Sequence, residues 1–140
     1  MPRDLPIGNG VLLASFDLDY QIRDFYYPRV GKENHALGHP WRFGVWLAGE
    51  FAWLDRDHWT LERAYVPDTL VTAVSASHPR LPLRLHFNDT VDYEKNILLR
   101  QVRVHNLSDR PLEPRLFVHT DINALENEIG DTVFFDPRNA

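Results

Sequence analysis

The chain has 140 residues and a formal net charge of −5, and 44% of its residues are hydrophobic. This length and composition are typical of a soluble globular domain with a hydrophobic core, and they exclude disordered and fibrous proteins. Because the chain contains no cysteine, disulfides, iron–sulfur clusters, thiolate zinc sites and cysteine nucleophiles are excluded as well.

Charge and hydropathy patterns also limit the partners that we expect. No Lys/Arg run supports binding to nucleic acid. No apolar run approaches the ~20 residues of a membrane helix. The N-terminal sequence Met-Pro-Arg-Asp-Leu-Pro lacks the apolar core of a secretion signal, so we expect a cytoplasmic protein.

The first elements indicate a hairpin followed by a long loop. Gly8-Asn9-Gly10 suits a tight turn and precedes an expected strand at Val11–Asp17, which Asp19-Tyr20 separates from a second strand at Gln21–Tyr27. Residues 28–40 contain two prolines, two glycines and an asparagine. They predict an ordered loop, of a length that is more often functional or interface-forming than accidental.

The clearest hairpin is predicted next, with Trp41–Leu47 and Phe51–Leu54 joined by Ala48-Gly49. In the first of these strands, apolar residues alternate with Arg42, Gly44 and Trp46. Trp46 therefore lies opposite the apolar face, where we expect another domain or a partner to cover it.

Further strands complete an all-β pattern. They are expected at Thr60–Val66, Leu70–Ser77, Leu83–Asn88, Ile97–Val104 and Leu112–Thr120. Only Asp121–Glu128 has a helical pattern, and no linker or repeat divides the chain. We therefore expect one antiparallel β-sandwich domain over residues 1–140. Val133-Phe134-Phe135 resembles the start of another strand and the chain stops five residues later, so we expect an incomplete portion of a larger sandwich.

Acidic and histidine residues offer weak candidates for a site. A glycosidase needs two carboxyl groups at a defined separation, which sequence alone does not give, so turn residues are the favoured interpretation of the acidic clusters. Loop histidines that only form hydrogen bonds are likewise favoured over metal ligands, and calcium binding is disfavoured because the EF-hand spacing is lacking. We therefore predict no metal and no cofactor. The acidic clusters are Asp17, Asp19 and Asp24; Asp55 and Asp57; and Glu126, Glu128 and Asp131; the candidate metal ligands are Glu33, His35 and His39; the candidate calcium site is Asp121–Asp131.

Three segments carry a resemblance to a known family. Asp4–Gly10 (DLPIGNG), Gln21–His35 (QIRDFYYPRVGKENH) and Trp41–Trp53 (WRFGVWLAGEFAW) resemble the N-terminal region of bacterial and archaeal members of glycoside hydrolase family 15. That family contains glucoamylases, glucodextranases and trehalase-like enzymes. The resemblance continues more loosely through Leu83–Val104 to Asp121–Pro137.

The resemblance implies a supersandwich-like β-domain that packs against an (α/α)6 barrel, either in the same chain or as a separate one. The catalytic glutamates of the family belong to the barrel, so we assign no catalytic residue and expect this chain alone to be inactive. The matched loop would face the barrel or its cleft, where an α-glucoside or oligosaccharide binds. The residues assigned to this role are Arg23, Asp24, Tyr26, Tyr27, Glu33, Asn34, His35 and Trp46.

Three functions follow as hypotheses. The first is a non-catalytic N-terminal domain of a family 15 enzyme that hydrolyses α-glucosidic bonds. The second is a stand-alone carbohydrate-binding module with Trp46, Trp53 or Trp59 as a stacking platform, although alternating aromatic residues more often belong to a core. The third is a β-rich protein that self-associates through open strand edges.

Overall fold

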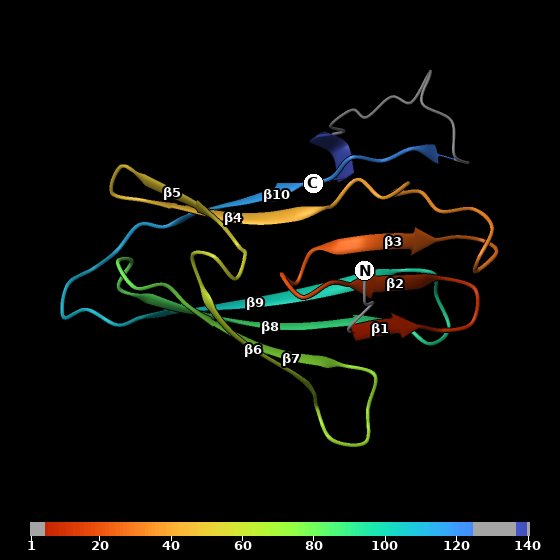
Figure 1. Cartoon of the computed structure of the whole chain (residues 1–140), viewed down its shortest axis with the longest axis horizontal. Helices are drawn as coiled ribbons and strands as arrows, with labels where there is room; N and C mark the ends of the chain where they lie inside the picture. Colours follow the sequence, from red (N-terminus) through yellow and green to blue (C-terminus); the bar gives the residue numbers. More distant parts are fainter. Residues whose placement is uncertain (1–4, 125–136, 140) are drawn as a thin grey trace.

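A computed structural model describes residues 5–124 and 137–139, and it confirms the all-β prediction. The described residues form ten strands and the 3-10 helix η2 (Figure 1). The strands are β1 (Leu5–Gly8), β2 (Leu13–Phe16), β3 (Ile22–Tyr26), β4 (Arg42–Leu47), β5 (Glu50–Trp53), β6 (Thr60–Tyr65), β7 (Thr72–Ser77), β8 (Leu83–Val91), β9 (Leu98–Asn106) and β10 (Arg115–His119), and η2 is Pro137–Asn139. Among the described residues, no helix is long and apolar enough to cross a membrane.

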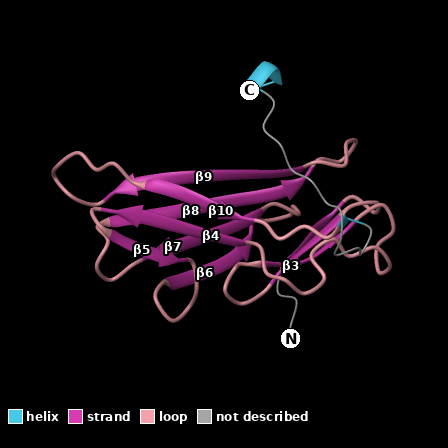
Figure 2. Cartoon of the chain, turned by 90° about the horizontal axis from the view of Figure 1, so that it is seen from above, coloured by secondary structure: helices cyan, strands magenta, loops and turns pink. Residues whose placement is uncertain are grey.

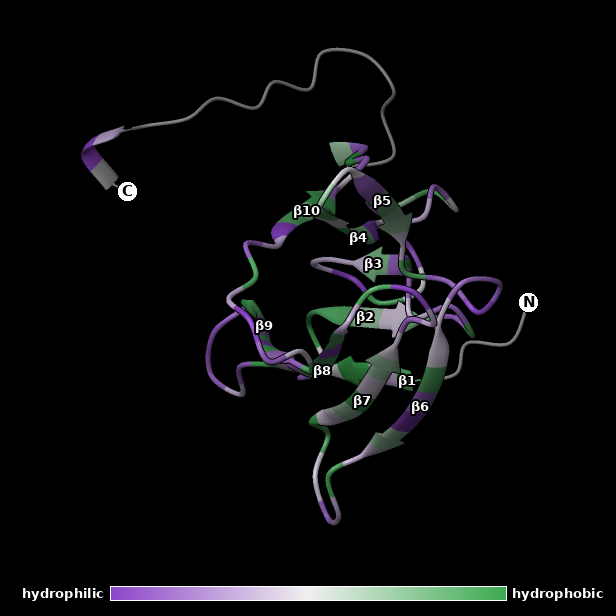
Figure 3. Ribbon diagram, turned by 90° about the vertical axis from the view of Figure 1, so that its left-hand side faces the viewer, coloured by the Kyte–Doolittle hydropathy of each residue, from purple (hydrophilic) through white to green (hydrophobic). Residues whose placement is uncertain are grey.

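The strands form three antiparallel sheets, in the orders β1-β2-β3, β10-β4-β5 and β6-β7-β8-β9. The second and third sheets face each other, and their strands run in similar directions (Figure 2), as in an aligned sandwich. The first sheet spans the space between them at one end, with β3 next to β4 and β1 next to β8 (Figures 1 and 3). A backbone bridge between Ile22 and Trp41 joins β3 to the start of β4. The predicted antiparallel β-sandwich is therefore confirmed.

Alternation of side chains determines which face of each strand is buried. In β4, Phe43, Val45 and Leu47 are buried, as the sequence pattern predicted. The β4–β5 hairpin turns at Ala48 and Gly49, whose φ angles of 52° and 91° lie in the left-handed region that glycine adopts at little cost. Strands β7 and β8 bury every second residue in the same way.

Two elements differ from the sequence-based expectation. The strand β1 was not predicted, and the Gly8-Asn9-Gly10 turn joins it to β2. Asn9 Oδ1 accepts hydrogen bonds from the backbone amides of Val11 and Leu12, at 3.0 and 2.9 Å, which fixes this turn. The helix expected at Asp121–Glu128 is absent from Asp121–Asn123. Residues 125–128, like the strand expected at Val133-Phe134-Phe135 and the acidic residues Glu126, Glu128 and Asp131, lie outside the described residues.

A buried polar network crosses the apolar core. Asp89 on β8 is 0% exposed and receives three close contacts from the guanidinium of Arg100 on β9, between 2.6 and 3.1 Å. The Tyr20 hydroxyl donates to Asp89 Oδ2 at 2.9 Å and lies 2.6 Å from the Thr72 hydroxyl. Because the Asp89 carboxylate is paired and hydrogen-bonded, its burial is tolerated. The guanidinium also stacks over three rings, those of Phe16, Tyr20 and Phe87.

The stability of the chain should fall more steeply above pH 10 than that of a Tyr20→Phe variant. Burial, followed by the charge of Asp89, raises the pKa of Tyr20 far above its ordinary value of 10.0. Unfolded chains release this proton near pH 10 while folded chains keep it, so the unfolding free energy decreases by about 1.4 kcal/mol per pH unit through this group. Urea titrations of both proteins between pH 9 and pH 11 measure the difference. Equal slopes would contradict the assignment.

Candidate functional site

The loop between β3 and β4 is held in place by the side chain of Asn34. Asn34 Oδ1 accepts hydrogen bonds from the backbone amides of Phe25, at 3.0 Å, and Ala36, at 3.1 Å. Its Nδ2 donates to Asp24 Oδ1 at 2.9 Å. The structure therefore brings two predicted site residues, Asp24 and Asn34, into direct contact, and there they fix the start and the middle of the loop.

His35 also holds this loop, through both its backbone and its imidazole ring. The backbone amide of His35 donates to the Phe25 carbonyl at 2.8 Å, and Tyr27 N donates to the Glu33 carbonyl at 3.2 Å. His35 Nε2 lies 2.6 Å from the Tyr27 carbonyl. Because a carbonyl only accepts, Nε2 must carry the proton in this contact. His35 thus positions the loop backbone.

The loop is also joined to the segment that follows β10. Trp41 Nε1 donates to the Asp121 carbonyl at 2.7 Å, and His39 Nδ1 lies 2.7 Å from Asp121 Oδ2. The backbone amide of Asn123 donates to the His35 carbonyl at 2.8 Å. Segments 80 or more residues apart in the sequence therefore meet at this loop.

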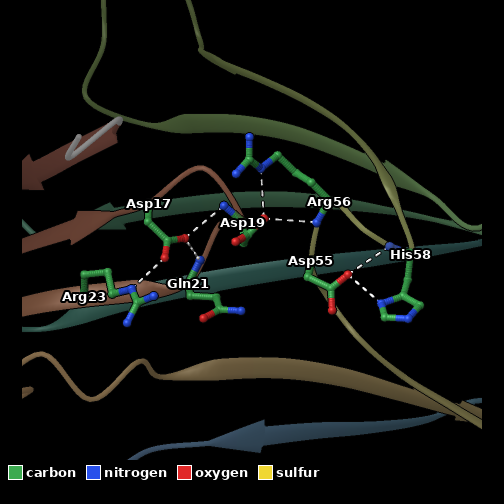
Figure 4. Close-up of polar contacts among 7 residues, drawn as sticks. All are labelled: Asp17, Asp19, Gln21, Arg23, Asp55, Arg56 and His58. Carbon is green, nitrogen blue, oxygen red and sulfur yellow. Dashed lines mark hydrogen bonds and ion pairs between the residues drawn. The ribbon is translucent and has the colours of Figure 1, made fainter. Parts of the chain in front are cut away.

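Arg23 contacts Asp17, in the turn between β2 and β3 (Figure 4), and also Gly38 in the loop. Its Nε donates to Asp17 Oδ2 at 2.7 Å, and its Nη1 lies 3.3 Å from the Gly38 carbonyl. Asp17 Oδ1 accepts from the backbone amides of Asp19 and Gln21. Asp17 is thus a turn-forming residue, as favoured from the sequence, but it is buried and not solvated.

The other acidic side chains near this turn are also partnered (Figure 4). Asp19 accepts from Arg56 at 2.9 Å, and Asp55 Oδ1 accepts from the backbone amide of His58 at 2.9 Å. Burial alone would raise the pKa of Asp19, but hydrogen bonds from Arg56 and the charge of its guanidinium outweigh burial and lower that pKa. These carboxylates consequently stabilise turns.

Three predicted site residues, Tyr26, Tyr27 and Glu33, have less of a structural role. The Tyr27 side chain is 40% exposed, and Tyr26 is half-buried. Glu33 Oε1 lies 3.8 Å from Arg29 Nη1, while its Oε2 is buried and accepts no hydrogen bond from any described residue. The exposed Tyr27 side chain suits hydrogen bonding to a polar ligand or to a neighbouring domain, whereas the Glu33 Oε2 atom is covered.

The candidate metal ligands do not assemble. Within residues 5–124 and 137–139, no three His, Asp or Glu side chains are grouped closely enough to hold an ion. His35 and His39 instead bind the Tyr27 carbonyl and Asp121, respectively. Both histidine rings therefore form hydrogen bonds, as the sequence favoured.

Trp46 belongs to a second candidate surface on the outer face of the β10-β4-β5 sheet. The Arg115 guanidinium stacks over the Trp46 ring at 4.9 Å. Phe51 packs edge-to-face against Trp53 at 4.8 Å and against Phe117 at 5.4 Å. We call this surface, formed by Trp46, Phe51, Trp53, Arg115, Phe117 and His119, the aromatic face.

Gly44 makes the aromatic face possible. A Cβ atom at this position would lie 2.7 Å from the Phe51 ring and 2.9 Å from the Trp53 ring. Both rings can therefore lie across β4 only because residue 44 has no side chain. Trp59, the third candidate platform residue, is 3% exposed and donates to the Trp53 carbonyl, so it belongs to the core.

Sequence reasoning missed Phe51, Arg115 and Phe117 as members of one surface. The alternation of Phe51 and Trp53 on β5 was a usable signal. The pairing of β10 with β4 was not, because these strands are distant in the sequence. The Trp46 ring, which we expected another domain or a partner to cover, is partly covered by Arg115 of the same chain.

The Asn34→Ala variant should show a loosened loop and an unfolding free energy lower by about 2–3 kcal/mol, because two backbone amides and the Asp24 carboxylate lose the hydrogen bonds that they make with Asn34. Hydrogen exchange of residues 25–36 and urea unfolding measure both effects. The matched control is Lys32→Ala, an exposed change in the same loop, with an effect below about 0.5 kcal/mol. Equal effects of the two changes would contradict the role of Asn34.

Comparison with known proteins gives one informative similarity. The chain is 29% identical over 132 residues to an uncharacterized glycosyl hydrolase from Methanocaldococcus jannaschii. The match covers 92% of this chain but 20% of that protein, so the chain spans about a fifth of the length of the relative. No family model matches the chain, and no solved structure matches it. The similarity supports a relationship to glycoside hydrolases.

Proposed function

We propose that this chain is a non-catalytic β-sandwich region of a glycoside hydrolase of family 15, a glucoamylase-like enzyme that cleaves α-glucosidic bonds. The observation that carries the proposal is the similarity of 92% of the chain to one fifth of a much longer glycosyl hydrolase. The resemblance of Gln21–His35 and Trp41–Trp53 to that family supports the finer assignment.

The role within such an enzyme is to support a catalytic (α/α)6 barrel and the edge of its cleft. The loop between β3 and β4 suits this role because Asn34 and Arg23 hold it rigidly while Tyr27 stays exposed. Rigid loops with exposed polar tips are common at binding sites. In this proposal, Tyr26, Tyr27 and Glu33 contact the barrel or an α-glucoside, and the enzyme acts in the cytoplasm.

Two experiments test this function. The purified chain should release no glucose from maltose, isomaltose or trehalose, and glucose release that disappears on a single Glu→Gln change would overturn the proposal.

The coding DNA next to that of this chain should encode helical repeats with paired glutamates, in frame or as a neighbouring gene. Their absence from both places would also count against it.

With that helical region coexpressed, the effect of a Tyr27→Ala change tests the loop itself. We expect a lower kcat/KM with unchanged thermal unfolding, because the Tyr27 side chain is exposed in this chain. A matched Val11→Ala change, at an exposed apolar residue outside the loop, should leave kcat/KM unchanged. Equal kcat/KM values for the unchanged protein, Tyr27→Ala and Val11→Ala would contradict a role of the loop in the cleft.

The aromatic face favours a second candidate, a stand-alone carbohydrate-binding module. Aromatic rings beside hydrogen-bonding side chains can stack on sugar rings, and Phe51 is 42% exposed there. Titration of tryptophan fluorescence with maltoheptaose decides this alternative. A saturable change at millimolar sugar that a Trp53→Ala variant loses would support it, and a flat titration would exclude it.

A further inference from the structure

A polar hollow lies on the outer face of the β6-β7-β8-β9 sheet, opposite to the face that packs in the core. Its volume is about 380 Å³, which is within the range of small-molecule sites. The hollow forms because β7 presents only the small side chains of Ala73, Ser75 and Ser77 on this face, whereas the neighbouring strands present longer ones. The longer polar side chains at its border are Glu62, His86, Asn88 and Arg103.

The two ends of the hollow carry opposite charge. The strand register aligns one row of residues across it, in the order Glu62, Ser75, His86 and Arg103. Glu62 lies on the edge strand β6 and is the one acidic residue among those that line the hollow. Because a carboxylate only accepts hydrogen bonds, this end suits the hydroxyl groups of a ligand. The other end suits an anionic group.

The basic end belongs to a block of four side chains on β8 and β9. Arg84 is opposite His105 in the strand register. His86 is opposite Arg103, and its ring centroid lies 4.9 Å from that of His105. We call these four residues the basic block. Like charges directly opposite each other destabilise a pair of strands, so an anion that binds here removes an unfavourable interaction.

The two arginines of the basic block are held by neutral partners. Arg103 Nη2 donates to Asn88 Oδ1 at 3.0 Å and to Gln101 Oε1 at 2.8 Å. Arg84 Nε donates to Ser77 Oγ at 3.2 Å. Among the residues that the structure describes, no carboxylate forms an ion pair with either arginine. These contacts therefore orient both guanidinium groups without neutralising their charges.

The pKa of His86 is sensitive to the same charges. Burial, followed by the positive charges of the other three members of the basic block, lowers this pKa below its ordinary value. The negative charge of Glu62 acts in the opposite direction, and β7 contributes no titratable side chain. A bound anion favours the protonated imidazole, so its binding should raise the pKa of His86.

We propose that this hollow binds a small phosphate monoester that also carries hydroxyl groups. The phosphate contacts Arg103 and His86, with Arg84 and His105 beside it, and the hydroxyl groups donate to Glu62. The inference does not rest on the glycosidase proposal, because it uses neither the β3–β4 loop nor the aromatic face.

The charges of the hollow favour a phosphate ester over other anions. Two permanently charged guanidinium groups match an ester that carries up to two negative charges, and arginine binds phosphate oxygens with paired hydrogen bonds. A nucleic acid fits less well, because the basic block is short and the chain has a net charge of −5. The carboxylate of Glu62 also repels a second anionic group at the far end of the hollow.

Glucose 6-phosphate is the probe, and calorimetry with the full chain should show saturable one-to-one binding. Glucose, inorganic phosphate and glucuronate, which lack the phosphate, the hydroxyl groups and the second negative charge, respectively, should each bind at least about tenfold more weakly. Absence of saturable binding up to about 10 mM glucose 6-phosphate would overturn the proposal. Equal binding by any of the three controls would overturn it as well, and so would tighter binding of a single-stranded oligonucleotide.

Histidine NMR titrations with and without glucose 6-phosphate locate the site. The ligand should raise the pKa of His86 and leave that of His39, in the β3–β4 loop, unchanged. An unchanged pKa of His86 in the presence of bound ligand would overturn the assignment of the hollow.

Two arginine variants form a matched pair. Arg103→Met should weaken binding of glucose 6-phosphate at least about tenfold, and it should fold because the side chain is exposed. Arg29→Met, in the β3–β4 loop, changes an arginine whose side chain is 69% exposed and should leave binding unchanged. Equal binding by the two variants would overturn the role of the basic block.

A third variant, Glu62→Gln, tests the other end of the hollow through a gain of binding, which a damaged fold would not produce. Loss of the carboxylate removes a repulsive charge, so inorganic phosphate should bind more tightly. The preference for glucose 6-phosphate over inorganic phosphate should therefore fall. An unchanged preference would overturn the role of Glu62 and the hydroxyl-bearing class of ligand.

Discussion

Replacing Arg100 by methionine should lower the free energy of unfolding by about 3–5 kcal/mol. The change removes the guanidinium that contacts Asp89 at 2.6–3.1 Å and leaves a carboxylate that is 0% exposed without its counter-charge. It also removes the cation that stacks over the rings of Phe16, Tyr20 and Phe87. Urea unfolding of both proteins at neutral pH measures the loss.

Two controls separate this buried charge from a general effect of losing an arginine. Arg103→Met, on the exposed face of the same strand, should change stability by less than about 0.5 kcal/mol. The double variant Asp89→Leu/Arg100→Met removes both charges and should recover much of the loss of Arg100→Met alone. A loss near 1 kcal/mol for Arg100→Met would contradict a central role for this ion pair.

Replacing Phe87 by alanine should cost a similar 3–5 kcal/mol, because it leaves a cavity where the two facing sheets meet. The Phe87 side chain on β8 is 1% exposed. Its ring lies 5.0 Å from that of Phe43 on β4 and 5.4 Å from that of Tyr20. The measurement is again the urea-unfolding free energy, with the slope against urea checked for equality.

Phe51→Ala is the matched control for Phe87→Ala, since it removes the same side chain from the half-exposed aromatic face. We expect a loss of about 1 kcal/mol there. Similar losses at Phe51 and Phe87 would mean that the sandwich interior contributes less than the contacts of Phe87 indicate.

Strands with one buried face could be predicted from the sequence. The alternation in Trp41–Leu47 is strict because Phe43, Val45 and Leu47 all enter the core while Arg42, Gly44 and Trp46 face outward. The strand β1 escaped prediction because its four residues include Pro6 and Gly8, which favour turns. Its structure depends on pairing with β2, which the local sequence does not encode.

The end of β8 escaped prediction for a different reason. The predicted strand stopped at Asn88 because Asp89 and Thr90 have the composition of a turn, yet β8 continues through them to Val91. Asp89 stays in the strand because Arg100, opposite to it on β9, neutralises its charge. Polar residues inside a strand can therefore be understood only together with their partners on the next strand.

The loop was predicted as an ordered element, and its residues as a group, but not their roles. Asn34 and His35 hold the loop through backbone contacts at the end of β3, and these depend on how the chain folds back on itself. The aromatic face depends likewise on the register between β4 and β10. Sequence patterns identify faces of single strands, whereas both candidate surfaces arise from strands and loops that meet in space.

The pairing of β10 with β4 has a consequence for the order of events during synthesis. β4 and β5 are neighbours in the sequence and can pair once Glu50–Trp53 have been synthesised, but the other edge of β4 pairs with Arg115–His119. Until β10 emerges, β4 keeps one edge open. Contacts of such large sequence separation form late and slowly, and unpaired edges expose a nascent chain to aggregation. Conditions that slow translation between β5 and β10 should therefore lower the yield of soluble protein more than they lower its final stability.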